Sequence, residues 1–278
     1  MSAAPRDVSR LHALFADACF GDSEAALGGD LSKYLARQGV AKEDADALLA
    51  SPRRLGLYRQ LLRHNVTNVI GQMLERTRDR LNRRAPGVFA KTVSDWLAAE
   101  GPKTPHLRDV PSEFLAWAAP RWRRESSSDP RIPSWLVDHA ELELVEFTIS
   151  VAPRPLPPPP LADVAPDRPL VFADPRVIVR LTHAVHELPA DDFDAVPAER
   201  EVRILAYRDG EHRTRFLDLT PAAAAILAKL FEGLPLANAM VEGCKAADIP
   251  LDNTVLAGAA RLLADLGERG VLLGARSS

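Results

Sequence analysis

The spacing of hydrophobic residues predicts helices throughout the first half of the chain. Apolar side chains that recur every three or four residues fall on one face of a helix. The clearest such stripe comprises Tyr58, Leu61, Leu62, Val66, Val69, Ile70 and Met73. Similar patterns predict helices over 11–18, 88–99, 111–119 and 133–151, although 145–151 is equally compatible with a strand. We therefore expect an all-α N-terminal domain.

The pattern changes in the second half. Residues 176–187, 201–207 and 212–219 are rich in β-forming side chains, and 208–211 is a turn signal. Thr220 and Pro221 are typical of a helix start. Helices are expected over 222–232, 236–247 and 252–269, followed by a short strand at 271–273. This order predicts a small α+β domain, with an arrangement like that of a winged helix or a peptide-recognition domain.

A proline-rich run separates the two halves. Proline lacks the backbone N–H and has a fixed φ, so residues 153–160 cannot form a helix or a central strand. We expect a polyproline II spacer there. The predicted organisation is a helical domain over 1–152, a linker over 153–169 and an α+β domain over 170–278, which makes the fold class α+β.

Composition limits the possible functions. The chain has 278 residues, 46% hydrophobic and 26% charged, with a net charge of -3. These values are ordinary for a globular protein and exclude a uniformly basic nucleic-acid binder. There is no apolar run long enough for a membrane span and no apolar signal segment at the start, so we expect a cytoplasmic protein. Cys19 and Cys244 are too far apart in sequence to form a C-x-x-C site.

Candidate catalytic residues are scarce. On a strand, His183 and His186 would point to opposite faces and could not share a metal ion. His139 and Glu143 could meet on one helical face, but two ligands make a weak site. No nucleotide-binding, hydrolase or metalloprotease motif is present. We expect no catalytic residue, metal ion or cofactor in this chain.

Basic residues cluster between Ser51 and Lys91. This segment contains ten basic residues and only two acidic ones, Glu75 and Asp79. If the helix is continuous, the apolar stripe passes into a basic stripe that would bind phosphate or an acidic protein surface. If the helix breaks near Glu75, these arginines are simply solvated. The basic stripe comprises Arg76, Arg80, Arg83 and Arg84.

The second domain offers two kinds of binding. A winged helix would insert its last helix into DNA, but Arg261 and Arg269 are outnumbered there by acidic residues. The other possibility is that a peptide adds as a strand to a sheet edge and packs against that helix; both elements could also be ordinary core. The expected peptide-binding residues are Thr214, Arg215, Phe216, Leu217, Leu219, Val255, Ala259 and Leu262.

Several short segments carry a family resemblance. They are LHALFADACFG at 11–21, YRQLLRHN at 58–65, Phe89, PHLRD at 105–109, Phe114-Leu115 and PSWLVDHAELE at 133–143. Their order and spacing resemble the N-terminal domain of the HvfC/BufC family, which has long carried a DNA-binding label. The chain departs from that pattern at 22–50 and at 74–86. Residues 216–233, FLDLTPAAAAILAKLFEG, are similar to the peptide-recognition elements of ribosomal-peptide biosynthesis.

The resemblance implies a non-catalytic partner subunit. Such a subunit would pair with an iron-dependent oxidative enzyme of the same gene cluster, which holds the iron, and would bind the leader of a ribosomally made precursor peptide. We place enzyme docking at Arg59, Arg63, Arg76 and Arg80. The alternative is a DNA-binding transcriptional regulator that uses the arginine-rich segment; we do not otherwise expect nucleic acid or a membrane as a partner.

Overall fold

The chain forms two compact units, Met1–Ala140 and Glu141–Ser278. The computed structural model describes Phe20 and residues 31–37, 39–40, 42–50, 52–153 and 158–277. The helix expected over 11–18 and Cys19 lie outside the described residues. The first unit is helical and the second mixes helices with antiparallel sheets, which confirms the predicted α+β class.

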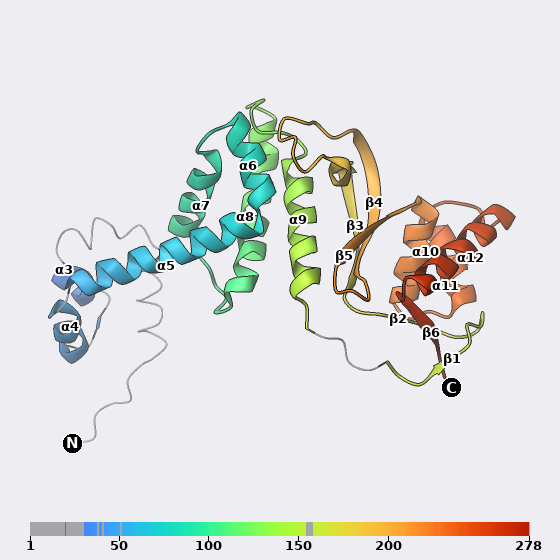
Figure 1. The fold of residues 1–278 in the computed structure, drawn as a ribbon. Coiled ribbons are helices and arrows are strands. Elements are labelled where there is room, and N and C mark those ends of the chain that lie inside the picture. The colour runs from blue at the N-terminus through green and yellow to red at the C-terminus, as the bar shows by residue number, and fades with distance from the viewer. Residues whose placement is uncertain are drawn as a thin grey trace, which may run out of the picture. The chain divides into compact units, whose positions relative to one another are not determined.

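The first unit is built from helices, as the apolar spacing predicts (Figure 1). Helix α9 is divided between the two units, and its last turns are helical where the sequence also allowed a strand. The elements are α3 (Leu31–Arg37), α4 (Lys42–Leu49), α5 (Pro52–Met73), α6 (Glu75–Arg84), α7 (Val88–Ala99), the 3-10 turn η1 (Leu107–Asp109), α8 (Val110–Ser126) and α9 (Leu136–Val151).

Aromatic side chains from α7 and α8 form the centre of the first unit. Phe114 packs edge-on against Phe89, Trp96 and Trp122, with ring centroids 5.7–5.9 Å apart. This geometry is the one that aromatic pairs prefer. The Trp122 indole N–H donates a hydrogen bond of 3.3 Å to Thr92 Oγ1, so the buried polar atom of this ring has a partner. Helices α7 and α8 are thereby fixed against each other.

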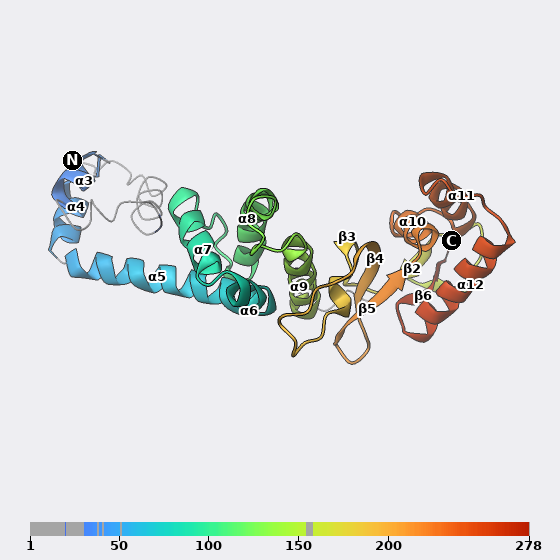
Figure 2. The same cartoon turned by 90° about the horizontal axis from the view of Figure 1, so that it is seen from above.

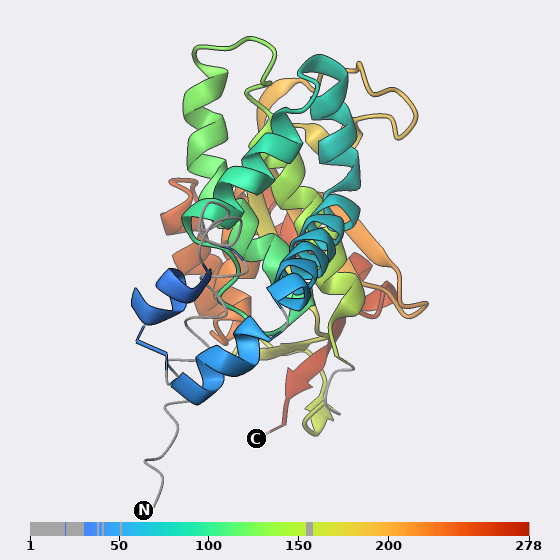
Figure 3. The same cartoon turned by 90° about the vertical axis from the view of Figure 1, so that its left-hand side faces the viewer.

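The arginine-rich segment is not one continuous helix. The backbone breaks at Leu74, whose φ of -119° and ψ of 42° end α5 before α6 begins. Figure 3 looks nearly along α5, and α6 leaves at a steep angle to it. The break near Glu75 is thus confirmed and the continuous basic stripe is wrong. With such a break the arginines were expected to be solvated. This expectation is wrong for Arg80, whose side chain is buried at 2% exposure.

The described residues of the second unit form two three-stranded antiparallel sheets. The β-rich segments expected as strands form one of them, in the order β3-β4-β5, although the first strand ends at His183 rather than at 187. The other sheet has the order β1-β6-β2. The strand bounds are β1 (Leu161–Ala162), β2 (Leu170–Phe172), β3 (Arg176–His183), β4 (Glu199–Arg208), β5 (Thr214–Leu219) and β6 (Leu272–Arg276).

Besides the last turns of α9, the described residues of the second unit form three α-helices: α10 (Pro221–Phe231), α11 (Leu236–Ala246) and α12 (Asn253–Glu268). Figure 2 shows them grouped around β2 and β6. Thr220 Oγ1 accepts a hydrogen bond from the Ala223 N–H and caps α10 as predicted, and Asp252 caps α12 in the same way. The apolar faces of these helices, with Leu227 and Leu266, pack with Leu205 of β4 to make the core of the unit.

The region expected to be a linker contains structured residues. Strand β1 lies within it and pairs with β6, and the carbonyl of Pro166 accepts a hydrogen bond from Ala237 N–H. The spacer therefore does not extend to residue 169. The last turns of α9 also belong to the second unit, because Thr214 Oγ1 donates to the Glu146 carbonyl at 3.2 Å.

Candidate functional site

Strand β5 is an edge strand of the β3-β4-β5 sheet. Its partner is β4, with Leu217 opposite Leu205 and Phe216 opposite Ala206. Within the described part of the chain, the outer edge of β5 makes no backbone hydrogen bond. An unpaired strand edge presents a row of N–H and C=O groups that can pair with another extended chain. Among the described residues, the outer edge of β5 therefore keeps backbone groups with which an added strand could pair.

The β4–β5 hairpin holds this edge in place. Asp209 accepts hydrogen bonds from the backbone N–H of Glu211 and of Arg213, both at 2.9 Å. Its carboxylate also pairs with Arg215 at 2.6 Å. The Arg213 N–H, followed by Arg215, holds the pKa of Asp209 below its usual value. The turn residue is therefore charged at neutral pH and keeps the hairpin closed.

An apolar pocket of about 370 Å³ opens where β5 ends, between α10 and α12. Ala222 and Ala223 line its α10 side, and Gly258 and Ala259 line its α12 side. These small side chains leave space that larger ones would fill, and a Cβ added at Gly258 would meet no atom within 4 Å. Ile226, Leu230, Val255 and Leu262 also line the pocket and make its walls apolar. The pocket can take up an apolar side chain.

The structure brings together half of the expected peptide-binding residues in this pocket: Leu219, Val255, Ala259 and Leu262 line it. The rest lie along β5 and differ in what their side chains do. Arg215 is exposed and ion-paired, whereas Thr214 and Phe216 are half-buried. Leu217 packs against the core of the second unit. The edge strand and the pocket thus meet at Leu219.

Sequence reasoning missed the α10 side of the pocket. The available signal was the alanine run at 222–225, which lies within the segment that resembles peptide-recognition elements but was not among the expected peptide-binding residues. The finding that small residues on α10 face Gly258 and Ala259 requires knowledge of how α10 and α12 pack. The sequence predicted a peptide-binding groove between one strand and one helix. The pocket is instead lined by the end of one strand and by two helices.

The predicted docking arginines are not equivalent. Arg76 is exposed and Arg59 half-buried, while Arg63 donates a hydrogen bond of 3.0 Å to the Phe20 carbonyl. Arg80 does not fit a docking surface, because its guanidinium lies in the interior beside α9 rather than in solvent. The prediction assumed one continuous helix through Leu74, so that Arg80 would continue the apolar stripe beyond the core and meet a partner; the break at Leu74 removes that assumption. We therefore remove Arg80 from the set.

The histidine predictions also change. His183 ends β3, but His186 lies in the 3-10 turn η2 (Val185–Glu187), so the two do not share a strand. His139 is buried and hydrogen-bonded to Thr77 Oγ1 at 2.8 Å. Among the described residues, His186, Glu187 and Asp218 form one group whose side chains could hold a metal ion, and no sequence pattern predicted it.

An open strand edge beside an apolar pocket, in a small α+β domain, is typical of proteins that bind an extended peptide. Residues 177–267, about a third of the chain, match the family model of the HvfC C-terminal domain. That match spans the β3-β4-β5 sheet and most of α12, so it contains both the strand edge and the pocket. No curated protein matches the chain. Among the described residues, no helix has the length and apolar character needed to cross a membrane.

Proposed function

We propose that this chain is a non-catalytic partner subunit of an iron-dependent peptide-modifying enzyme. It would bind the leader of a ribosomally made precursor peptide and present that peptide to the enzyme, which holds the iron. The observation that carries the proposal is the meeting of the open β5 edge with the α10–α12 pocket inside the HvfC C-terminal match. The resemblance of the first half to the HvfC/BufC family supports the same role.

The geometry suggests how a leader would bind. Its backbone would pair with the outer edge of β5 through main-chain hydrogen bonds, which do not depend on the side chains of the leader. An apolar side chain of the leader would enter the pocket and supply most of the selectivity. Leu219, buried at 8% exposure, lies where the edge of β5 meets the pocket. The paired backbone of the leader and its apolar side chain would therefore occupy one continuous site.

The DNA-binding alternative receives less support from the arginines. Arg78 is paired with Asp79 at 2.7 Å and with Glu75 at 3.5 Å, and Arg80 is buried. On α12, Arg269 is paired with Asp265 at 2.8 Å. Arginines that already have carboxylate partners gain little from phosphate, because the existing pair must be broken first. The peptide-binding role is therefore better supported than DNA binding.

The test fills the pocket without touching the strand. Gly258→Phe places a ring in the open space, whereas Gly267→Phe places the same ring on the same helix outside the pocket, again with no atom within 4 Å of its Cβ. The probe is the precursor peptide encoded beside the gene, labelled at its C-terminus and followed by fluorescence anisotropy. We expect Gly258→Phe to weaken binding at least about tenfold, the range of a well-packed anchor.

Gly267→Phe should bind the peptide like the unmodified chain. Equal affinities for all three proteins would place the binding site elsewhere and remove the groove from the proposal. Co-expression with the neighbouring genes tests the enzyme partner separately. A complex that contains iron and a second protein supports the partner role; a lone protein whose DNA affinity falls steeply with salt would support the regulator instead.

A further inference from the structure

A cluster of three side chains with metal-binding chemistry lies at the pocket end of β5. His186 comes from η2, Glu187 follows it, and Asp218 comes from β5. The Nε2 atom of His186 is 3.0 Å from Asp218 Oδ1 and 3.9 Å from Glu187 Oε1. One nitrogen and two carboxylate oxygens thus converge within 4.8 Å of one another, although Asp218 is distant in sequence from the adjacent pair His186 and Glu187.

The spacing suits a small tetrahedral ion. Zinc bonds of about 2.0–2.2 Å at tetrahedral angles hold ligand atoms roughly 3.3–3.5 Å apart. The two distances from His186 Nε2, 3.0 and 3.9 Å, lie on either side of that value. An imidazole nitrogen favours Zn²⁺ and its first-row neighbours over Ca²⁺ and Mg²⁺, which prefer sites made entirely of oxygen. Three protein ligands leave one coordination position open.

Two features limit the affinity of such a site. Arg200 forms an ion pair with Glu187 and competes with a metal ion for that carboxylate. The Nδ1 atom of His186 is buried and has no hydrogen-bond partner among the described residues. A ligating histidine normally donates its second N–H to an acceptor, and loss of such a partner costs about 10–100-fold in metal affinity. We therefore expect a micromolar site rather than a nanomolar one.

We propose that His186, Glu187 and Asp218 bind one first-row transition-metal dication, with Zn²⁺ as its representative. Asp218 also lines the α10–α12 pocket, so a bound ion would lie beside the peptide groove. That link to the groove rests on the proposed function; the metal site itself does not. The ion would join η2 to β5 and fix the strand end at which the pocket opens.

The experiment titrates Zn²⁺ into the metal-free full chain in competition with a chromophoric chelator. Asp218→Asn and Glu187→Gln each remove one carboxylate from a largely exposed side chain, so the fold should be kept. We expect one equivalent of Zn²⁺ for the unmodified chain and a loss of affinity of at least about tenfold in each variant. Arg200→Gln frees Glu187 and should tighten binding, a gain that a damaged fold would not produce.

His212→Asn is the matched control, because it removes an exposed histidine from outside the cluster, and asparagine tolerates its positive φ of 62°. Its zinc affinity should equal that of the unmodified chain. Absence of micromolar zinc binding would overturn the proposal, as would equal affinity in Asp218→Asn and Glu187→Gln, which would mean an adventitious ion only. Displacement of Zn²⁺ by equimolar Ca²⁺ would overturn the assigned ion class. No peptide is present, so failure here is distinct from failure of the groove.

Discussion

Thr77 on α6 and His139 on α9 are joined by a hydrogen bond of 2.8 Å between Oγ1 and Nδ1 in the interior of the first unit. Both side chains are buried. Burial, together with the nearby positive charges of Arg80 and Arg76, lowers the pKa of His139 to about 3. His139 is therefore neutral at pH 7, and protonating it would place a third positive charge beside the two arginines.

The first prediction is that acid destabilises the first unit through His139. The unfolded chain takes up this proton near pH 6.5, whereas the folded chain resists it down to about pH 3. In that window the unfolded state binds more protons, so the free energy of unfolding falls as pH falls, by on the order of 1 kcal/mol per pH unit. His139→Asn keeps a polar atom near Nδ1 and cannot be protonated.

Urea unfolding of both proteins at pH 7 and pH 5 measures this effect. All four tryptophans, Trp96, Trp117, Trp122 and Trp135, belong to the first unit, so tryptophan fluorescence follows that unit alone. The unmodified chain should lose more stability between the two pH values than His139→Asn does. Identical losses would show that other groups set the acid sensitivity.

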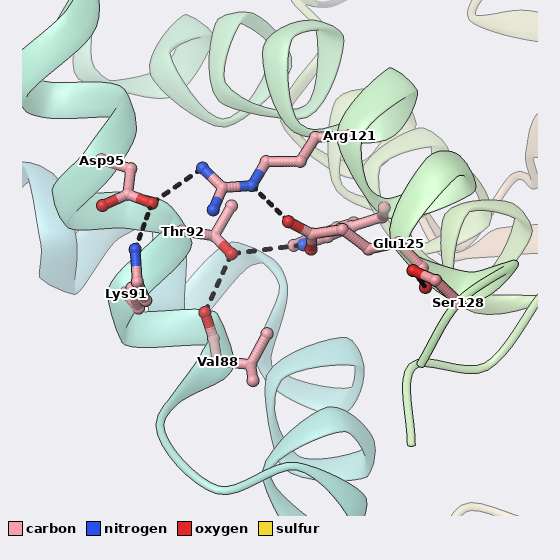
Figure 4. Close-up of polar contacts among 8 residues, drawn as sticks. Val88, Lys91, Thr92, Asp95, Arg121, Glu125 and Ser128 are labelled. Carbon is pink, nitrogen blue, oxygen red and sulfur yellow. Dashed lines mark hydrogen bonds and ion pairs between the residues drawn. The ribbon is translucent and has the colours of Figure 1, made fainter. Parts of the chain in front are cut away.

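The second prediction compares two polar contacts between α7 and α8, both shown in Figure 4. Thr92 Oγ1 accepts the buried Trp122 N–H, while Arg121 bridges Asp95 at 2.7 Å and Glu125 at 2.8 Å near the surface. Thr92→Val leaves the indole N–H without an acceptor and should cost about 1–3 kcal/mol. Arg121→Met should cost about 1 kcal/mol or less, because solvent screens ion pairs near the surface.

Urea titrations with tryptophan fluorescence give both values, and a repeat at high salt separates the two mechanisms. Salt should reduce the cost of Arg121→Met, because it screens the ion pairs of the unmodified chain, and should leave the cost of Thr92→Val unchanged. If Arg121→Met proved the more costly variant, the charged bridge rather than the buried hydrogen bond would hold α7 to α8.

The third prediction concerns two glycines inside helices of the second unit. A Cβ at Gly243 on α11 would lie 2.7 Å from the backbone of Ile226 on α10, whereas a Cβ at Gly258 on α12 would meet nothing within 4 Å. Gly243→Ala should therefore destabilise by about 1–3 kcal/mol, because the two helices must move apart. Gly258→Ala should stabilise by up to about 1 kcal/mol, since alanine is the better helix former.

Thermal unfolding followed by circular dichroism gives the sign of each change. Hydrogen exchange of peptides from α10 and α11 then shows where the loss occurs, and faster exchange should be confined to Gly243→Ala. Destabilisation of similar size by both alanines would contradict the close approach of α10 to α11.

The sequence predicts this fold best where one local pattern decides the structure. The β-forming side chains of 201–207 lie in β4, and the Thr220-Pro221 pair starts α10 where it was expected. Strands β1 and β2 were missed because two or three residues carry no periodicity. They form because β6, more than a hundred residues later, supplies their hydrogen-bond partners.

The residues of the candidate sites were likewise predictable where a local pattern decides their position and not where distant contacts decide it. Leu219, Val255 and Leu262 could be chosen because a strand end and a helix face are visible in sequence. The burial of Arg80 and the meeting of His186 with Asp218 were not predictable, since each depends on contacts between segments distant in sequence. Local periodicity indicates which face of an element is apolar, and only the packing of elements shows which polar groups that face encloses.

The last prediction concerns the proposed enzyme-docking surface of the first unit. With Arg80 removed, Arg76 is the most exposed arginine of the predicted set. Arg76→Glu reverses a charge that an acidic surface of the partner enzyme would meet, so it should abolish or strongly reduce co-purification of that enzyme. The control is Arg108→Glu, a reversal at an arginine of η1 that is 63% exposed and lies outside the predicted set.

Tryptophan fluorescence must first show that both variants are folded, because Arg76 also acts on the buried His139. Peptide affinity, measured on the isolated subunit, should stay unchanged in both, since the proposed groove lies in the second unit. Loss of the enzyme with Arg76→Glu alone would assign docking to α6. Equal recovery of the enzyme by Arg76→Glu and the control would move docking to another surface, and the groove would remain to be judged by its own pocket-filling test.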